Sequence, residues 1–227
     1  MKLADVLDYV RERVAESGTS VSAEALDRIG TYFDLLRRWN GTVNLTGFDL
    51  AAPTSAALDR LLVEPVVAAG LAAARGWTSP ASHLIDIGSG GGSPALPFAL
   101  AAAVRSVTLV ESRVRKGVFL REALRAVALD GQVLVERLDS ATVLDAGRQF
   151  DVLTIRAVRV EGELLGQLVR LVTAGGHLLF FRTEGTVDPF AAFPGIQNLE
   201  TFSLVAESPS QLAVLRTTST TPPGERP

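Results

Sequence analysis

The chain contains no cysteine and only two histidines. Without cysteine it forms no disulfide and offers neither a thiolate metal ligand nor a cysteine nucleophile. Both histidines, His83 and His177, adjoin predicted strands, so we interpret each as a packed strand-end residue and expect no metal site. The sequence also lacks an apolar run long enough to span a membrane, since Val63–Ala74 is short and contains Glu64 and Pro65.

The N-terminal residues show no signal-peptide pattern, because residues 1–14 are amphipathic and carry Asp and Arg throughout. We therefore expect a cytoplasmic protein, and we expect it to be a monomer. With 227 residues, 47% of them hydrophobic, the chain can bury the core of one large domain or of one domain with an appendage. Its formal net charge of −3 does not favour binding to nucleic acid, so an RNA partner would need a local basic face.

A glycine-rich stretch in the middle of the chain organises the rest. The apolar run Leu84–Ile87 predicts a buried strand, and glycines at positions 88, 90, 91 and 92 end it in a tight turn. Ser93 is placed to cap a following helix, whose first turn tolerates Pro94 because that position needs no N–H. Such a turn brings backbone N–H groups close to a ligand, so we expect a nucleotide-like cofactor.

The acidic residues around this turn narrow the choice of cofactor. The glycines do not fit the G-x-G-x-x-G fingerprint of dinucleotide sites, because position 93 is serine. A second apolar strand, 106–110, leads into Glu111, whose carboxylate is placed to accept ribose hydroxyls. Asp86 before the glycines and Glu111 after the second strand resemble the S-adenosylmethionine (AdoMet) site of class I methyltransferases. A glycine turn alone is also compatible with a plain strand-to-helix connection, and the alternation that follows favours the cofactor site.

Strands and helices alternate after residue 84, which predicts an α/β fold with a mostly parallel, Rossmann-like sheet. The chain should close with an antiparallel hairpin of 199–204 and 211–217 around Ser208-Pro209-Ser210. The other predicted strands are 84–87, 106–111, 132–137, 150–155 and 176–182, and the helices between them are 94–104, 113–129 and 160–173.

Before the sheet, residues 1–80 read as a small helical region. Leu3–Val14 has the apolar spacing of an amphipathic helix, Ser22 is placed to cap a second one, and Pro65 should kink a third that spans residues 52–74. The segment 39–47 between the last two is polar and contains two glycines; Trp39 is compatible with core packing at a helix end, and Asn44 and Thr46 with a capped turn. We expect the methyltransferase domain to span 81–217 and the proline-containing residues 218–227 to be a disordered tail.

Four segments together resemble the RsmG or GidB family of bacterial 16S rRNA (guanine-N7) methyltransferases. Trp39-Asn40 with Asn44-Leu45-Thr46 is similar to the W-N-x-x-x-N-L-T signature, and Asp86–Pro97 is similar to the D-[IV]-G-[ST]-G-x-G-x-P-G-[IL]-P segment. Glu111-Ser112 with Arg115, Lys116, Phe119 and Leu120 resembles the second-strand end and basic helix, and Phe150–Ala157 resembles F-D-x-[IV]-x-[ST]-R-A. The resemblance covers most of residues 20–182.

The chain departs from the family pattern at several positions. Ala56 and Asp59-Arg60 stand where the family shows His and Asp-Ser, and Gly117 and Val118 dilute the basic cluster. Arg182 stands at the place of a late lysine, followed by Thr183 and Glu184 before Gly185. These departures affect the RNA target more than the AdoMet site.

The resemblance implies methyl transfer from AdoMet to guanine N7 in 16S rRNA of the small ribosomal subunit. N7 carries a free lone pair, so no general base is required, and catalysis rests on holding the acceptor in line with the methyl group. Two rival functions stay open: a class I methyltransferase with a small-molecule or protein acceptor, and a non-catalytic, ribosome-associated paralogue.

Roles for individual residues follow from the same reading. Arg156 ends the fourth strand and should hold the AdoMet carboxylate or an RNA phosphate, with a salt bridge to Asp86 or Asp151 as the alternative. Asp139 either accepts from the adenine amine or caps a helix. The full cofactor set is Asp86, Gly88, Ser89, Gly90, Ser93, Glu111, Ser112, Leu138, Asp139 and Arg156, with Arg156 as the catalytic candidate. The RNA-binding set is Arg37, Arg38, Asn40, Asn44, Arg113, Arg115, Lys116 and Arg182.

Overall fold

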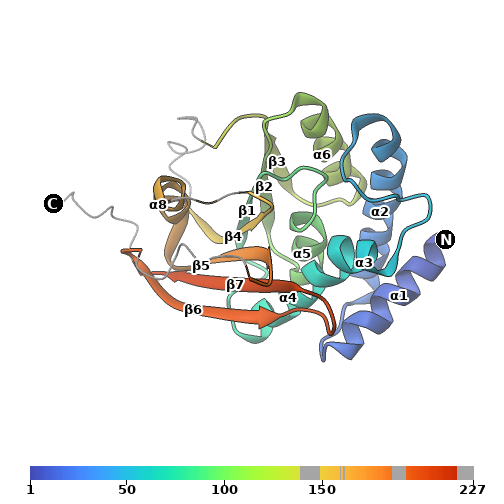
Figure 1. Cartoon of the computed structure of the whole chain (residues 1–227). Helices are drawn as coiled ribbons and strands as arrows, with labels where there is room; N and C mark the ends of the chain where they lie inside the picture. Colours follow the sequence, from blue (N-terminus) through green and yellow to red (C-terminus); the bar gives the residue numbers. More distant parts are fainter. Residues whose placement is uncertain (139–148, 159, 161, 186–192, 219–227) are drawn as a thin grey trace.

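A computed structural model of the chain describes residues 1–138, 149–158, 160, 162–185 and 193–218. Asp139 and the predicted tail from residue 219 onward lie outside these residues. In the described part, a seven-stranded sheet has the order β3-β2-β1-β4-β5-β7-β6. All neighbours are parallel except β7, which runs antiparallel to both β5 and β6. The predicted mostly parallel sheet and its closing antiparallel hairpin are thereby confirmed (Figure 1).

The strands fall close to their predicted places. Most bounds differ by a few residues, but β5 begins earlier and β3 ends earlier than expected. The strands are β1 His83–Ile87, β2 Ser106–Val110, β3 Gly131–Leu134, β4 Phe150–Arg156, β5 Val172–Thr183, β6 Ile196–Ser203 and β7 Ser210–Thr217.

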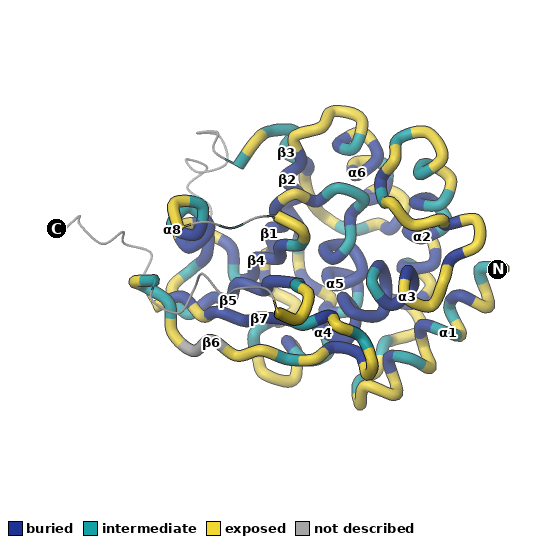
Figure 2. Tube along the Cα trace, in the orientation of Figure 1, coloured by how far each residue is buried: buried dark blue, intermediate teal, exposed yellow. Residues whose placement is uncertain are grey.

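Successive side chains along a strand belong alternately to two separate hydrophobic clusters, one on each face of the sheet. Leu84 of β1 packs with the helices of one face, and its neighbour Ile85 packs with α8 (Gly162–Leu171) on the other. Asp86 is two residues after Leu84 in the same strand, so it lies on the same face of the sheet as Leu84. We call this the helix-rich face. Figure 2 shows the buried stretch that runs through the central strands and the helices behind them. A sheet covered on both faces explains why its strands are continuous apolar runs.

The helix-rich face is covered by the N-terminal helices as well as by the crossover helices of the sheet (Figure 1). Buried residues of α1 and α2 belong to the same cluster as Leu84, Val107 and Val152 of the sheet. The helices, besides α8, are α1 Leu3–Glu16, α2 Ala23–Val43, α3 Ser55–Leu58, η1 Asp59–Val63, α4 Glu64–Ala74, α5 Ala95–Ala102 and α6 Val114–Ala126. The helical region and the sheet thus share one core.

The second helix starts as predicted but ends later. The Ser22 hydroxyl accepts from the N–H of Ala25 at 3.1 Å, which confirms the cap. The helix continues through Trp39 and Asn40 to Val43, so Trp39 lies near its end. Asn44 ends it in a left-handed conformation, φ 51°, which asparagine adopts more readily than most residues.

The third helical stretch is interrupted just before Pro65 rather than kinked at it. The interruption, η1, is a π-helical turn, and Pro65 occupies the first turn of α4. Because Pro65 has no N–H, it cannot donate to the carbonyl of Leu61 four residues earlier. That carbonyl accepts from the hydroxyl of Ser93 at 2.8 Å instead.

This use of Ser93 overturns its predicted role as a helix cap. The N-cap residue of α5 is Pro94, and no side chain caps that helix. The Ser93 hydroxyl serves a tertiary contact, which the local sequence pattern could not reveal.

Within the described residues, no helix is both long and apolar enough to cross a membrane. The same residues contain no cluster of three or more His, Asp or Glu side chains arranged to hold a metal ion.

Candidate functional site

The glycine turn after β1 forms one wall of a cavity of about 300 Å³. Gly88 and Gly90 have positive φ, 74° and 53°, and the N–H groups of Gly88 and Ser89 both donate to the carbonyl of Val110. A Cβ on Gly88 would lie 2.8 Å from a methyl carbon of Val158, so only glycine keeps this side of the cavity open. The strand ends of β1 and β4 therefore meet at a hollow edge of the sheet, where open α/β sheets bind ligands.

The opposite wall of the cavity comes from α2 and the loop that follows it. Leu36 of α2 and Leu45, Thr46 and Phe48 of the loop line it. Asn40 holds this loop: its Oδ1 accepts from the N–H of Thr46 at 2.9 Å, and its Nδ2 donates to the carbonyl of Phe48 at 3.3 Å. The similarity of this segment to the W-N-x-x-x-N-L-T signature thus has a structural basis, because Asn40 shapes the cavity through the backbone. The RNA contact predicted for Asn40 stays a prediction.

Tyr32 of α2 fastens the glycine turn to the helical region. Its hydroxyl donates to the carbonyl of Gly91 at 2.7 Å, and its ring is fully buried. A Cβ on Gly91 would come within 3.1 Å of the carbonyl oxygen of Leu45, so the turn and the loop pack closely. The sequence offered no sign of this contact beyond the apolar spacing of α2.

Glu111 braces the turn from the end of β2. One carboxylate oxygen accepts from the N–H of Gly90 at 2.9 Å and the other from the N–H of Arg113 at 2.8 Å. Each carboxylate oxygen can accept a further hydrogen bond, so the predicted contact to ribose hydroxyls remains open to it.

Asp86 is a buried carboxyl group at the base of the turn. Thr154 donates to its Oδ1 at 2.6 Å, and its Oδ2 has no partner in the described part of the chain. Burial raises the pKa of Asp86 to about 6, against the lowering effect of the hydroxyl donors. The carboxyl group at the base of the glycine turn therefore takes up a proton more easily than an exposed carboxyl group does.

Arg156 lines the cavity, but its anion is neither Asp86 nor Asp151. Its Nη2 lies 3.0 Å from the carboxylate of Glu64, at the start of α4. Asp151 instead accepts from the N–H of His83 at 2.7 Å. Burial lowers the pKa of Arg156 to about 10, a shift that the Glu64 carboxylate opposes. The expectation that Arg156 pairs with an anion is correct for the folded chain, and its contact to a cofactor or phosphate stays a prediction.

Lys116 is the basic residue of α6 that reaches the cavity. It lines the cavity, and a Cβ on Gly90 would lie 4.0 Å from its Nζ. No carboxylate in the described residues pairs with it, so its charge is available to an anionic group of a ligand.

The remaining basic candidates lie on the surface outside the cavity. Arg113, the N-cap of α6, and Arg115 on that helix are exposed, whereas Arg37 and Arg38 both pair with Asp34, at 2.8 Å and 3.5 Å. Both ion pairs are partly exposed to solvent, so exchange of Asp34 for a phosphate as the partner of either arginine would cost little free energy.

Four further candidates are not part of the cavity wall. Arg182 donates to the hydroxyl of Thr201 on β6 at 3.1 Å, and Asn44 is the exposed cap of α2. Ser112 is exposed, and Leu138 lies four residues beyond the end of β3. Their predicted roles remain predictions, and Asp139 lies outside the described residues.

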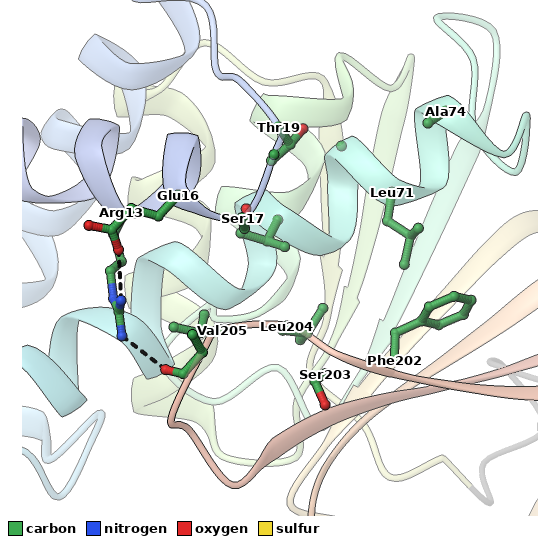
Figure 3. A pocket seen from close by; sticks show the side chains of 14 residues that line it. Arg13, Glu16, Ser17, Thr19, Leu71, Ala74, Phe202, Ser203, Leu204 and Val205 are labelled. Atoms are coloured by element: carbon green, nitrogen blue, oxygen red, sulfur yellow. Dashed lines mark hydrogen bonds and ion pairs between the residues drawn. The ribbon is translucent and has the colours of Figure 1, made fainter.

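A separate cavity of about 380 Å³ lies between the end of α1, α4 and the β6–β7 connection. Its lining mixes apolar residues such as Leu71 and Phe202 with polar ones such as Ser17, and Arg13 is paired with Glu16 and with the carbonyl of Ala206 (Figure 3). It shares no lining residue with the cavity at the glycine turn and holds none of the predicted site residues.

The fold and the cavity define a class of protein. A sheet with this strand order, an antiparallel β7, and a cavity at a glycine turn braced by a carboxylate is the arrangement of class I methyltransferases. A variant of MtNAS solved in complex with S-adenosylmethionine superposes with a TM-score of 0.56 at 16% identity, over 96% of this chain and 93% of that one. At that identity the likeness concerns the fold alone.

Sequence comparison identifies the family more specifically than the fold does. The family model for rRNA small subunit methyltransferase G matches residues 25–198. Ribosomal RNA small subunit methyltransferase G of Paramagnetospirillum magneticum is 34% identical over 80% of this chain and 81% of its own length. The protein of the same name from Chloroflexus aggregans is 36% identical over 77% of this chain and 71% of its own length. The chain therefore belongs to the rRNA small subunit methyltransferase G family.

Proposed function

We propose that this chain transfers a methyl group from AdoMet to N7 of a guanine in 16S rRNA of the small ribosomal subunit. The observation that carries the proposal is the cavity itself, which joins the glycine turn of β1 to the loop of the W-N-x-x-x-N-L-T segment. Two of the segments that resemble the family thus form opposite walls of one space. We also propose that the protein acts in the cytoplasm, where ribosomal subunits are found.

The residues of the cavity fit AdoMet. The turn at Gly88 and Gly91 leaves no room for side chains on the cavity side, and Glu111 places a carboxylate beside it. Lys116 and Arg156 supply positive charge for the methionine carboxylate or for an RNA phosphate. Ser112 and Leu138 belong to the proposed cofactor set, Leu138 as a residue that would flank the adenine; Asp139, proposed to accept from the adenine amine, lies outside the described residues.

Methylation of guanine at N7 requires no proton transfer by the protein before the methyl group is attacked. AdoMet supplies the methyl group when bound; the S–CH₃ bond breaks as the N7–CH₃ bond forms, and the positive charge passes from sulfur to the guanine ring. No proton leaves before attack, so the reaction needs no general base. What the chain contributes is alignment of N7 with the methyl group and exclusion of water.

The proposal is tested by incubating the protein and radiolabelled AdoMet with small ribosomal subunits from a strain that lacks the family enzyme, and mapping the label. We expect one labelled guanine, methylated at N7. Label on a protein or a small molecule instead would favour a different acceptor, and AdoMet binding without transfer to any acceptor would favour a non-catalytic paralogue.

Gly88→Val tests the cofactor site itself. The added side chain meets Val158 and forces an L-residue into a positive φ, so AdoMet affinity measured by calorimetry should fall at least tenfold. Gly162→Ala is the matched control, since a Cβ there meets nothing within 4 Å and the residue lies on α8, on the other face of the sheet. Wild-type affinity in folded Gly88→Val would place the cofactor elsewhere.

A further inference from the structure

The π-helical turn η1 frees a backbone carbonyl beside the candidate site. The N–H of Glu64 donates to Asp59, five residues earlier, and so leaves the carbonyl of Arg60 without its usual helical donor. That carbonyl accepts from Nη1 of Arg156 instead. The turn therefore holds the arginine at the end of β4 across 96 residues of sequence.

Glu64 holds the same arginine through its side chain. Its Oε2 accepts from Nη2 of Arg156 at 3.0 Å and lies 3.5 Å from Nη1 of Arg60. The side chains of Glu64 and Arg156 are only 2% and 8% exposed. Loss of either partner would leave a buried charge without compensation, which proteins tolerate poorly.

The guanidinium of Arg156 is thereby fixed in one orientation. Its Nη1 also lies 3.3 Å from Oγ of Ser93 in the glycine turn, and its plane stands over the ring of Phe181 with 4.7 Å between Cζ and the ring centroid. In the described residues its Nε has no partner. The arginine thus enters the cavity wall with both terminal nitrogens engaged and Nε unpaired.

Glu64 also stands at the boundary between two cavities. It lines a neighbouring cavity of about 460 Å³, which shares Phe48 and Arg60 with the cavity at the glycine turn. Arg60 reaches across to the hydroxyl of Ser210 at 3.0 Å. Glu64 thus lines the second cavity but not the one at the glycine turn, which Arg156 lines.

We propose that Glu64 is a positioning residue for methyl transfer, because its carboxylate orients Arg156 in the wall of the cofactor cavity. The proposal rests on the function proposed above. It assigns to the helical N-terminal region a part in organising the active site, supplied by a residue that lies outside all four family-like segments.

The test is a double-mutant cycle on Glu64 and Arg156. Glu64→Gln keeps the size of the side chain and loses its charge, and it should lower the single-turnover rate of methyl transfer to small subunits about tenfold. In an Arg156→Gln background, where no charge at position 156 can pair with Glu64, the same change should lower the rate less than twofold, because Glu64 acts through the arginine. The cycle is repeated with AdoMet affinity as the readout, which needs no RNA.

Val66→Ala is the control for a merely structural effect. Val66 is a buried residue of the same helix whose apolar side chain takes no part in the network, so it should lower the melting temperature and leave the rate per folded molecule unchanged. If Glu64→Gln does not fold, Glu64→Asp replaces it, since that change keeps the charge and draws it back from Arg156.

The outcomes separate this proposal from the proposed function. No transfer by the wild-type protein contradicts the proposed function. Two outcomes overturn the role of Glu64 while leaving the proposed function intact, provided that the wild type transfers the methyl group. One is a rate and an AdoMet affinity of the folded Glu64 variants equal to those of the wild type. The other is additive effects of the two substitutions in the cycle.

Discussion

At the scale of single residues, Asp86 shows how burial adjusts a group in the cofactor site. It is 1% exposed, it accepts one hydroxyl hydrogen bond, and its second oxygen has no partner in the described residues. Desolvation is the largest cause of its raised pKa, and the positive charge of Arg156 offsets only part of it. The folded chain therefore binds a proton at Asp86 at pH values where the unfolded chain has released it.

The sign of the pH dependence follows from this shift. A pKa raised from 3.8 to about 6 means that the stability contributed by protonated Asp86 is complete below pH 4 and is lost as the pH rises through 6. Asp86→Asn removes the titration. Its free energy of unfolding relative to wild type should therefore increase between pH 4.5 and pH 8, by about 2 kcal/mol. Urea denaturation at the two pH values measures the difference, and a difference that stays constant with pH would contradict the predicted shift.

At the scale of elements, α6 presents two kinds of basic residue. Arg115 is exposed on the helix surface, whereas Lys116 is half-buried and lines the cavity. Their neighbour Gly117 allows close packing, because a Cβ there would come within 2.5 Å of Val135. The dilution of the basic cluster at Gly117 thus has a packing reason, and it leaves the two flanking charges in different surroundings.

Single substitutions in α6 should distinguish the exposed Arg115 from Lys116, which lines the cavity. Arg115→Gln should weaken binding to small subunits and reduce the slope of log affinity against log salt by about one, with AdoMet affinity unchanged. Lys116→Gln should also weaken AdoMet binding or slow transfer at saturating AdoMet, because its charge faces the cavity. Affinity measurements over a salt series, with calorimetry for AdoMet, distinguish the two; identical effects of both variants would contradict the assignment.

At the scale of the whole molecule, the helical region and the sheet share one hydrophobic cluster. Phe33 of α2 is fully buried in it together with Leu84 and Val107 of the sheet, and Trp39 contacts Phe119 of α6 with 5.9 Å between ring centroids. The cavity also needs both parts, since Leu36 of α2 and the glycine turn after β1 both line it. We therefore expect the region 1–80 and the proposed methyltransferase domain 81–217 to unfold together.

Phe33→Ala tests this expectation. The cavity it creates should lower the free energy of unfolding by about 3–5 kcal/mol. Denaturation followed by circular dichroism and by tryptophan fluorescence should still give one coincident transition. Val118→Ala is the control, because this side chain is 44% exposed and should change little. An early transition of the helices alone would show that the N-terminal region is an independent unit.

The sequence by itself determined the features that depend on local patterns. The apolar runs, the glycines and the acidic residues at their ends predicted the parallel sheet, the turn at Gly88, the place of Glu111 and the antiparallel hairpin. Each of these follows from the spacing of a few adjacent residues, because strand periodicity and turn geometry are set by the backbone within that span.

Only the tertiary structure decided how the polar groups of the site are paired. Glu64 and Arg156 are 92 residues apart, and Ser93 contacts Leu61 rather than capping its own helix. Nothing in the spacing along the chain distinguished Glu64 from Asp86 or Asp151 as the partner of Arg156. Such pairings depend on which helix packs over which strand end. A buried charge needs an opposite charge nearby, and the tertiary fold decides which oppositely charged side chain lies close enough.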